Sequence, residues 1–359
     1  MGPAELAPRA GGTRMFVMTV PGLGQLAASS LLAVDGAEVT DVGFDGRSDV
    51  VVFEVDRRAR AAALRLTTVE DTFVEVGRTL RADGDNARWI AQRIWKAKRV
   101  ERALSMWANE VRPLSAAMTY RVIARVLQER SFLRTELRNQ MSRAIGQDKV
   151  RWRFGDPAQM ELWIVEYQPG KIVAGLRLSD ASMRQHDGRE LERKGALRPT
   201  VAAAMVYLAG EPAGLILDPC CGSGTILAEV LAAGWDSVAG SDIDPAAVDI
   251  ARANAAAADV VQADARHLDI PDRTVTACVS NLPFGQEFKV PGDMDKWLAQ
   301  VLSEMARVTV DEGRVVVLAP SIPRQIVPTD LRPVERHVVR LLGTRTSLWC
   351  YAKQNVRPT

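Results

Sequence analysis

The feature that most constrains the fold is the alternation of predicted elements from about residue 195 onward. This part of the chain reads as helix, strand, turn, helix, strand, a pattern typical of a parallel, doubly wound sheet. The stretch LDPCCGSGTILAE, residues 217–229, ends an apolar strand and leads through a glycine-rich turn into a helix. Ligands of such sheets bind at the carboxyl ends of the strands. The sequence therefore predicts a ligand site at this turn.

The residues of the turn narrow the choice of ligand. A phosphate-binding loop needs a Lys that is absent here, and a dinucleotide fingerprint needs a small residue where Leu227 stands. Gly222 and Gly224 let the backbone approach a ligand closely. The carboxylate of Asp218 suits a cationic group and repels a pyrophosphate. This charge preference indicates S-adenosylmethionine.

Two further carboxylates follow later strands. Asp242 ends the strand in VAGSDIDP, about 20 residues beyond the turn, where such folds place an acid on ribose hydroxyls. Asp264, in VVQADARHL, ends a third strand, and its carboxylate can accept a hydrogen bond from an adenine amino group. Strand ends often carry Asp as a turn or capping residue. Three acids at successive strand ends around one glycine turn nevertheless favour a cofactor site.

A side-chain amide, a proline and an aromatic ring stand close together in VSNLPFG, residues 279–285, after a fourth strand. The Asn281 amide oxygen and the Leu282 carbonyl can each accept one N–H of an exocyclic amine, which draws the nitrogen lone pair out of conjugation with the ring. Phe284 can stack on the base. A simple turn at Pro283 explains neither Asn281 nor Phe284. The motif therefore predicts a site that acts on the amine of a nucleobase.

Together, DPCCGSGTILAE, GSDIDP and SNLPFG resemble the class I methyltransferase domain of the THUMP-containing RNA methyltransferases, and most of all those that methylate guanine N2 in tRNA. The N-terminal part is similar to their ferredoxin-like plus THUMP module, so the resemblance covers nearly the whole chain. One departure is Leu282, where the common motif has Pro. The resemblance implies that the target base is held by Asn281, Leu282, Pro283 and Phe284. It implies that S-adenosylmethionine is bound by Asp218, Pro219, Cys220, Gly222, Ser223, Gly224, Thr225, Asp242, Ile243, Asp264 and Ala265.

The expected fold class is α/β, with a doubly wound, mostly parallel class I methyltransferase sheet after an N-terminal α+β module. Strands and helices before residue 80 are expected in the β-α-β-β-α-β order of a ferredoxin-like unit. The expected divisions are a disordered tail (1–13), a ferredoxin-like domain (14–80), a THUMP RNA-binding domain (81–182) and the methyltransferase domain (183–359).

Basic charge is concentrated in one segment of the N-terminal part. Residues 88–153 hold 16 Lys and Arg against 5 Asp and Glu. Such a stripe attracts polyanions, whereas a solvated, salt-bridged face mixes charge signs. The segment therefore favours nucleic-acid binding. The side chains expected to contact RNA are Arg121, Arg125, Arg130, Arg134, Arg138 and Arg143.

The expected reaction is direct methyl transfer to the exocyclic amine of a guanine in tRNA, forming N2-methylguanosine. Family likeness suggests guanosine 6 of the acceptor stem, and guanosine 10 next. No Cys is expected to act as a nucleophile. Two alternatives stay open, an adenine-N6 methyltransferase that acts on RNA or DNA through the same amide and carbonyl, and a non-catalytic RNA-binding protein.

The remaining expectations concern location and partners. No apolar run approaches the roughly 18 residues that span a bilayer, and the first residues lack the apolar core of a secretory signal. The four cysteines fit neither a disulfide framework nor a zinc-site spacing. We expect a cytoplasmic monomer that binds tRNA, with no metal and no membrane contact.

Overall fold

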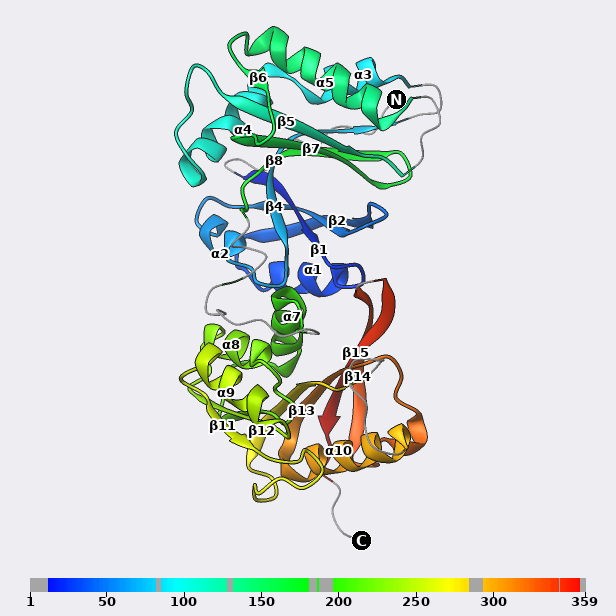
Figure 1. Cartoon of the computed structure of the whole chain (residues 1–359). Coiled ribbons are helices and arrows are strands. Elements are labelled where there is room, and N and C mark those ends of the chain that lie inside the picture. The colour runs from blue at the N-terminus through cyan, green and yellow to red at the C-terminus, as the bar shows by residue number, and fades with distance from the viewer. Residues whose placement is uncertain are drawn as a thin grey trace. The chain divides into compact units, whose positions relative to one another are not determined.

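The computed structural model contains two compact units, residues 1–184 and 185–359, each with its own sheet (Figure 1). The residues that the structure describes are 12–81, 85–127, 132–180, 186, 196–283, 293–341 and 343–355. Most of the segment expected as a tail lies outside these ranges, and Thr13 already begins the first strand.

The first unit is built on an eight-stranded sheet of order β2-β3-β1-β4-β8-β7-β5-β6. Its elements in chain order are β1 (Thr13–Thr19), α1 (Gly24–Leu32), β2 (Ala37–Phe44), β3 (Asp49–Val55), α2 (Arg60–Leu64), β4 (Asp71–Leu80), α3 (Ala87–Ile94), α4 (Ala97–Glu110), β5 (Thr119–Arg125), α5 (Arg134–Asp148), β6 (Arg153–Phe154), β7 (Met160–Gln168) and β8 (Lys171–Arg177).

The first four strands have the expected ferredoxin-like arrangement. They are all antiparallel in the order β2-β3-β1-β4, with α1 and α2 as the two crossovers. Because side chains alternate along a strand, Met15 and Val17 of β1 enter one core, while Phe16 and Met18 enter a second core on the other face. This alternation explains why the apolar run MFVM is buried on both sides.

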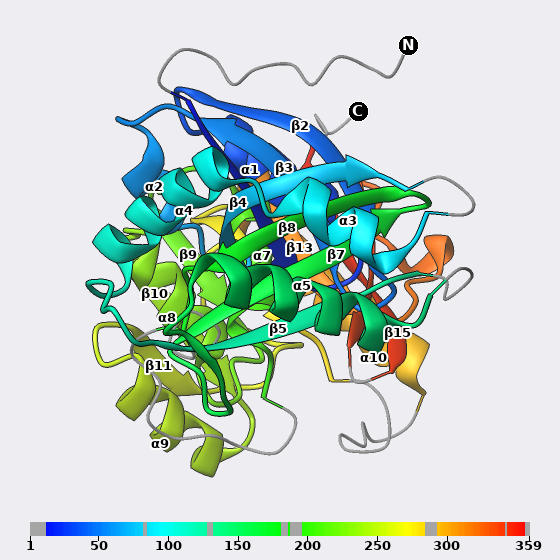
Figure 2. The same cartoon turned by 90° about the horizontal axis from the view of Figure 1, so that it is seen from above.

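The sheet does not stop at β4. This strand pairs with β8, so the segments 14–80 and 81–182 share one continuous sheet. The sheet curls until β2 meets β7, where Tyr167 Oη donates to Asp41 Oδ2 at 3.1 Å and Lys171 Nζ lies 2.7 Å from the same oxygen. Helices α3 and α5 lie side by side over one face (Figures 1 and 2).

The second unit is a seven-stranded sheet of order β11-β10-β9-β12-β13-β15-β14. Its elements are α7 (Pro199–Ala209), β9 (Leu215–Asp218), α8 (Thr225–Ala232), β10 (Ser237–Asp242), α9 (Pro245–Asn254), β11 (Asp259–Gln262), β12 (Val275–Asn281), α10 (Met294–Val308), β13 (Thr309–Ala319), the short 3-10 helix η1 (Arg324–Ile326), β14 (Leu331–Leu341) and β15 (Thr344–Lys353).

The expected doubly wound, mostly parallel sheet is confirmed. Strands β9 to β13 are parallel, and only β15 and β14 run antiparallel to their neighbours. Helices α7, α8 and α9 lie over one face and α10 over the other (Figure 1). In parallel strands the carboxyl ends meet at one edge, so Asp218, Asp242 and Asn281 end neighbouring strands at the same edge.

Candidate active site

The glycine turn after β9 combines two glycines with different roles. Both adopt positive φ, +53° at Gly222 and +80° at Gly224, a region that side chains rarely enter. A Cβ on Gly224 would lie 3.1 Å from the Cα of Ala251, so this glycine lets α8 begin against α9. A Cβ on Gly222 would meet no atom within 4 Å among the described residues. The backbone at Gly222 therefore borders open space that a ligand can enter.

Groups from neighbouring elements hold this turn in place. Gly222 N donates to Asp242 Oδ2 at 2.9 Å, and Cys221 N donates to the Ser241 carbonyl at 2.8 Å. The Asn254 side-chain amide, buried at the end of α9, donates to the Ser223 carbonyl at 2.9 Å. Sequence reasoning placed Asp242 here but missed Asn254, whose only signal was an amide at the end of a helix.

Asp218 ends β9 in a buried position, with 2% of its surface exposed. Ser280 Oγ donates to its Oδ1 at 2.7 Å, and Cys220 N donates to the same oxygen at 3.1 Å. Burial raises the pKa of the Asp218 carboxyl to about 7, because the two hydrogen bonds offset only part of the desolvation and the charge of Asp242 adds to it. A cation that binds beside this carboxyl stabilises its ionised form.

The carboxylate of Asp264 already has a partner. Arg266 Nη2 lies 2.5 Å from Asp264 Oδ2, and its Nε contacts both carboxylate oxygens at 3.0 and 3.1 Å. The side-chain hydrogen bond from Arg266 lowers the pKa of Asp264 below its usual value. A carboxylate has about four lone-pair sites, so an adenine amine has to share Asp264 with Arg266 or displace it. The sequence had not indicated this competition.

The other predicted cofactor residues differ in accessibility. Ile243 follows Asp242 and is 66% exposed, so it offers an apolar surface at the carboxyl edge. The Pro219 carbonyl accepts from Ser241 Oγ at 3.3 Å. Thr225 and Ala265 are buried, so their side chains pack within the unit. The exposed Ile243 is therefore the member of this group that can touch the face of a ring.

The motif that the sequence predicts to hold the base begins at Asn281, the last residue of β12. Asn281 Oδ1 is buried and accepts no hydrogen bond from any residue that the structure describes. Leu282 N donates to the Leu318 carbonyl of β13 at 3.2 Å, and the Leu282 side chain is 1% exposed. The proline of the common motif has no N–H and could not donate this bond. In this chain the hydrogen bond and the buried Leu282 side chain restrain the peptide, as the proline ring would do in the common motif. Phe284 lies outside the described residues.

The cysteines are poorly suited to covalent catalysis. Burial raises the pKa of the Cys278 thiol to about 12, and burial beside the carboxyls of Asp218 and Asp242 raises the pKa of Cys220 well above its ordinary value. The thiolate is the nucleophilic form of Cys, and it is disfavoured at both positions. These properties agree with the expectation that no Cys forms a bond to the base.

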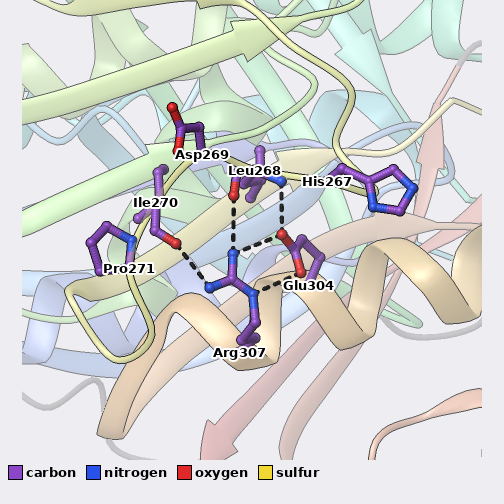
Figure 3. A pocket seen from close by; sticks show the side chains of 7 residues that line it. All are labelled: His267, Leu268, Asp269, Ile270, Pro271, Glu304 and Arg307. Atoms are coloured by element: carbon purple, nitrogen blue, oxygen red, sulfur yellow. Dashed lines mark hydrogen bonds and ion pairs between the residues drawn. The ribbon is translucent and has the colours of Figure 1, made fainter.

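A hollow of about 560 Å³ lies apart from this site, between the loop of residues 267–271 and α10 (Figure 3). Arg307 donates to the carbonyls of Leu268 and Ile270 at 3.0 and 2.9 Å, and Glu304 accepts from Leu268 N at 2.7 Å. Figure 3 shows both side chains pointing at the loop backbone. These contacts fasten the loop that follows Asp264, so the hollow has a structural explanation.

The arginines that the sequence assigned to RNA contact fall into two groups. Arg121 forms ion pairs with Asp156 and Glu161, and Arg125 lies 2.8 Å from the buried carboxylate of Asp45. The exposed positions on α5 are those of Arg134, Arg138 and Arg143, while Arg130 lies outside the described residues. Arg138 and Arg143 are therefore better placed than the two arginines on β5 to meet an external anion.

The described residues show neither a metal-binding cluster nor a membrane-spanning helix. No group of three or more His, Cys, Asp or Glu side chains there is arranged to hold a metal ion. Within the same ranges, every helix is too short or too polar to cross a membrane.

The strand order of the second unit, with its glycine turn and the acids at the carboxyl edge, is that of the class I methyltransferase fold. Residues 186–325, less than half of the chain, match the family model described as the RMKL-like methyltransferase domain. S-adenosylmethionine is the cofactor that the sequence predicts for this unit. The open space at Gly222 lets the backbone approach that molecule closely. The buried carboxyl of Asp218 suits its positive charge, and the exposed side chain of Ile243 suits contact with its ring system.

Known proteins extend the comparison. The U6 snRNA (guanine-N(2))-methyltransferase THUMPD2 of Bos taurus is 36% identical over 135 residues, which are 35% of this chain and 26% of that protein. The chain thus matches only about a quarter of that relative's length. TrmN from Thermus thermophilus superposes with a TM-score of 0.72 at 23% identity, covering 95% of this chain and 99% of that one. SMU.472, whose crystal structure was solved in complex with SAH, superposes with a TM-score of 0.66 at 13% identity, covering 97% of this chain and 100% of that one.

Proposed function

We propose that this protein is an S-adenosylmethionine-dependent RNA methyltransferase that forms N2-methylguanosine in tRNA. The observation that carries the proposal is the buried, unpartnered Asn281 Oδ1 at the carboxyl edge, in the part of the chain that the structure describes. An acceptor left without a donor costs free energy unless a ligand supplies one. An exocyclic amine supplies two N–H groups, one for Asn281 Oδ1 and one for the Leu282 carbonyl.

The chemistry then follows from positioning. When bound, S-adenosylmethionine supplies an electrophilic methyl group on a positively charged sulfur. Asn281 and the Leu282 carbonyl hold the amine in line with that methyl group and keep its lone pair out of the ring system. Asp218 and the backbone at Gly222 hold the cofactor side, and the peptide of Leu282 is fixed by its bond to Leu318. No covalent intermediate is required.

The N-terminal unit supports the choice of RNA. We propose that residues 14–80 form the ferredoxin-like part and 81–182 the THUMP part of one RNA-binding module, with α5 at its contact surface. Arg138 and Arg143 are exposed on this helix. Exposed arginines attract RNA phosphates without reading sequence. The relative from Bos taurus is named as a guanine-N(2) methyltransferase of U6 snRNA, which supports guanine N2 and makes that RNA a necessary comparison.

The test is incubation with labelled S-adenosylmethionine and unmodified tRNA or U6 snRNA transcripts, followed by nucleoside mass spectrometry. Asn281→Ala should lower kcat on the order of 100-fold, as loss of one preorganised hydrogen bond does elsewhere, without changing cofactor affinity. Asn355→Ala, an exposed amide after β15 at the edge of the same sheet opposite to Asn281, is the matched control. N2-methylguanosine in tRNA that depends on Asn281 supports the proposal. Methyladenosine establishes the adenine-N6 alternative, methylation of U6 snRNA alone corrects the substrate, and RNA binding without any methylated nucleoside leaves a binding protein.

A further inference from the structure

Basic charge in the second unit is concentrated in its last segment. Residues 191–335 contain 12 Lys and Arg against 20 Asp and Glu, whereas residues 336–359 contain 5 Lys and Arg and no acid. The unit as a whole is therefore acidic, yet its C-terminal hairpin is basic. The cofactor site and the base-holding motif use none of these basic side chains.

The hairpin places three arginines on one face. In its register Arg336 lies opposite Trp349, and Arg340 lies opposite Arg345. Directly opposed residues of an antiparallel pair project to the same face, and residues two or four apart along one strand share that face. Arg336, Arg340 and Arg345 therefore form a row, which we call the arginine face. The other face of the hairpin buries Val339 and Thr346.

The arginine face reaches beyond the edge that carries the active site. Asn281 pairs with Leu318 of β13, which pairs with Leu348 of β15, so these three residues lie in one row across the sheet. The pairing of β13 with β15 ends one residue later, at Ala319 opposite Ser347. Along β15, Arg345 lies three residues past Leu348, which places it about 10 Å beyond the row at the carboxyl edge. Across the sheet, it is two strand spacings, about 10 Å, to the side of Asn281. These positions lie on the side from which a base approaches Asn281.

The charges on the arginine face are not neutralised within the described residues. Like charges directly opposite each other destabilise a sheet, yet Arg340 and Arg345 face one another and neither has a carboxylate partner in the described ranges. Arg336 is held at 4.2 Å over the Trp349 ring and donates to Ser347 Oγ at 3.2 Å. The one acid of the hairpin, Glu335, pairs with His337. This arrangement suits an external anion.

We propose that the arginine face binds backbone phosphates of the RNA on either side of the target nucleotide. This inference rests on the proposed function, because it takes RNA as the substrate. Arg340 and Arg345 supply the main contacts, and the stacked Arg336 extends the row toward the sheet. The catalytic unit then contributes its own grip on the RNA, separate from the basic helices of the first unit.

The test compares Arg340→Gln and Arg345→Gln in the full chain with a control, Arg273→Gln. Arg273 is 52% exposed in the loop just before β12, at the opposite edge of the sheet, and its removal costs the same one charge. Binding of an unmodified tRNA transcript is measured over a range of salt concentrations, with the melting temperature of each variant. Each lost phosphate contact should reduce the slope of log K against log salt by about 0.9. The melting temperature should stay equal or rise, because a like-charge pair is relieved.

The outcomes separate this inference from the proposed function. A reduced slope and a higher KM for RNA in both hairpin variants, with unchanged cofactor affinity and an unchanged control, support the arginine face. Slopes equal to wild type, or an equal loss in the control, overturn it. A lower melting temperature with unchanged slope also overturns it, since the face then packs against protein. If both hairpin variants show the reduced slope but the wild-type protein methylates no RNA, the proposed function is wrong and the RNA-binding role of the arginine face still stands.

Discussion

The buried carboxyl of Asp218 leads to a quantitative prediction for Asp218→Asn. The pKa of this carboxyl rises from its ordinary value of 3.8 to about 7 on folding, a difference worth ~4 kcal/mol at 1.36 kcal/mol per unit. Between these two values the unfolded chain binds fewer protons than the folded one, so stability of the wild type falls as pH rises. Asn keeps an oxygen that can accept from Ser280 and Cys220, and it carries no charge. The variant should gain stability over wild type as pH increases.

Between pH 5 and pH 8 the difference in unfolding free energy between variant and wild type should grow by about 2.5 kcal/mol. Urea unfolding at each pH, read by pulsed hydrogen exchange of amides in β9 and β12, reports the second unit alone. At the same time Asp218→Asn should lose affinity for S-adenosylmethionine. In the wild type, binding at pH 7 should release about half a proton, measured by calorimetry in two buffers of different ionisation enthalpy.

The reasoning would be refuted by a difference in unfolding free energy that stays constant across this pH range. Such a result means that Asp218 ionises in the folded protein near its ordinary pKa, despite its 2% exposure. A constant difference together with proton release on cofactor binding would assign the proton to another group.

Three further predictions concern neighbouring residues. Gly224→Ala should destabilise the second unit by more than Gly222→Ala. Both substitutions cost about 1–2 kcal/mol because of positive φ, but only a Cβ at position 224 would crowd Ala251. Equal losses of unfolding free energy in urea would contradict this prediction. Gly222→Ala should instead weaken cofactor binding. Cys278 should resist iodoacetamide at pH 8 until urea unfolds the protein, and labelling of the native protein by mass spectrometry would show an accessible thiolate. Arg266→Gln should tighten S-adenosylmethionine binding in calorimetry, because it frees the carboxylate beside it; weaker binding would show that Arg266 positions that carboxylate instead.

The location of the candidate site was predictable, since it follows from local signals and one topological rule. A glycine turn and a polar side chain at each strand end can be read along the chain, and parallel strands bring those ends to one edge. Asp218, Asp242 and Asn281 meet there for that reason. The protonation of Asp218 was not predictable in the same way, because it depends on burial and on Ser280, 62 residues away in sequence.

Charge patterns along the chain indicate contacts less directly than apolar patterns do. The basic segment predicts Arg125 to contact RNA, but in the structure Arg125 pairs with Asp45, 80 residues earlier, across the curled sheet. The basic C-terminal hairpin does not stand out in the sequence, because the sum of charges over residues 191–359 is slightly negative. The net charge of a segment does not show where its basic residues are concentrated. The register of β14 and β15 is needed to show that three arginines share one face.

The sequence by itself determined the kind of fold and the sheet edge at which the candidate site lies, because turn residues, strand-end acids and apolar periodicity act over a few neighbouring positions. Tertiary structure alone decided which polar groups are satisfied. It paired Asp264 with Arg266, buried Asp218 and left Asn281 Oδ1 without a donor among the described residues. Burial and partnership are set by packing between distant segments, and the free energy of a polar group depends on both.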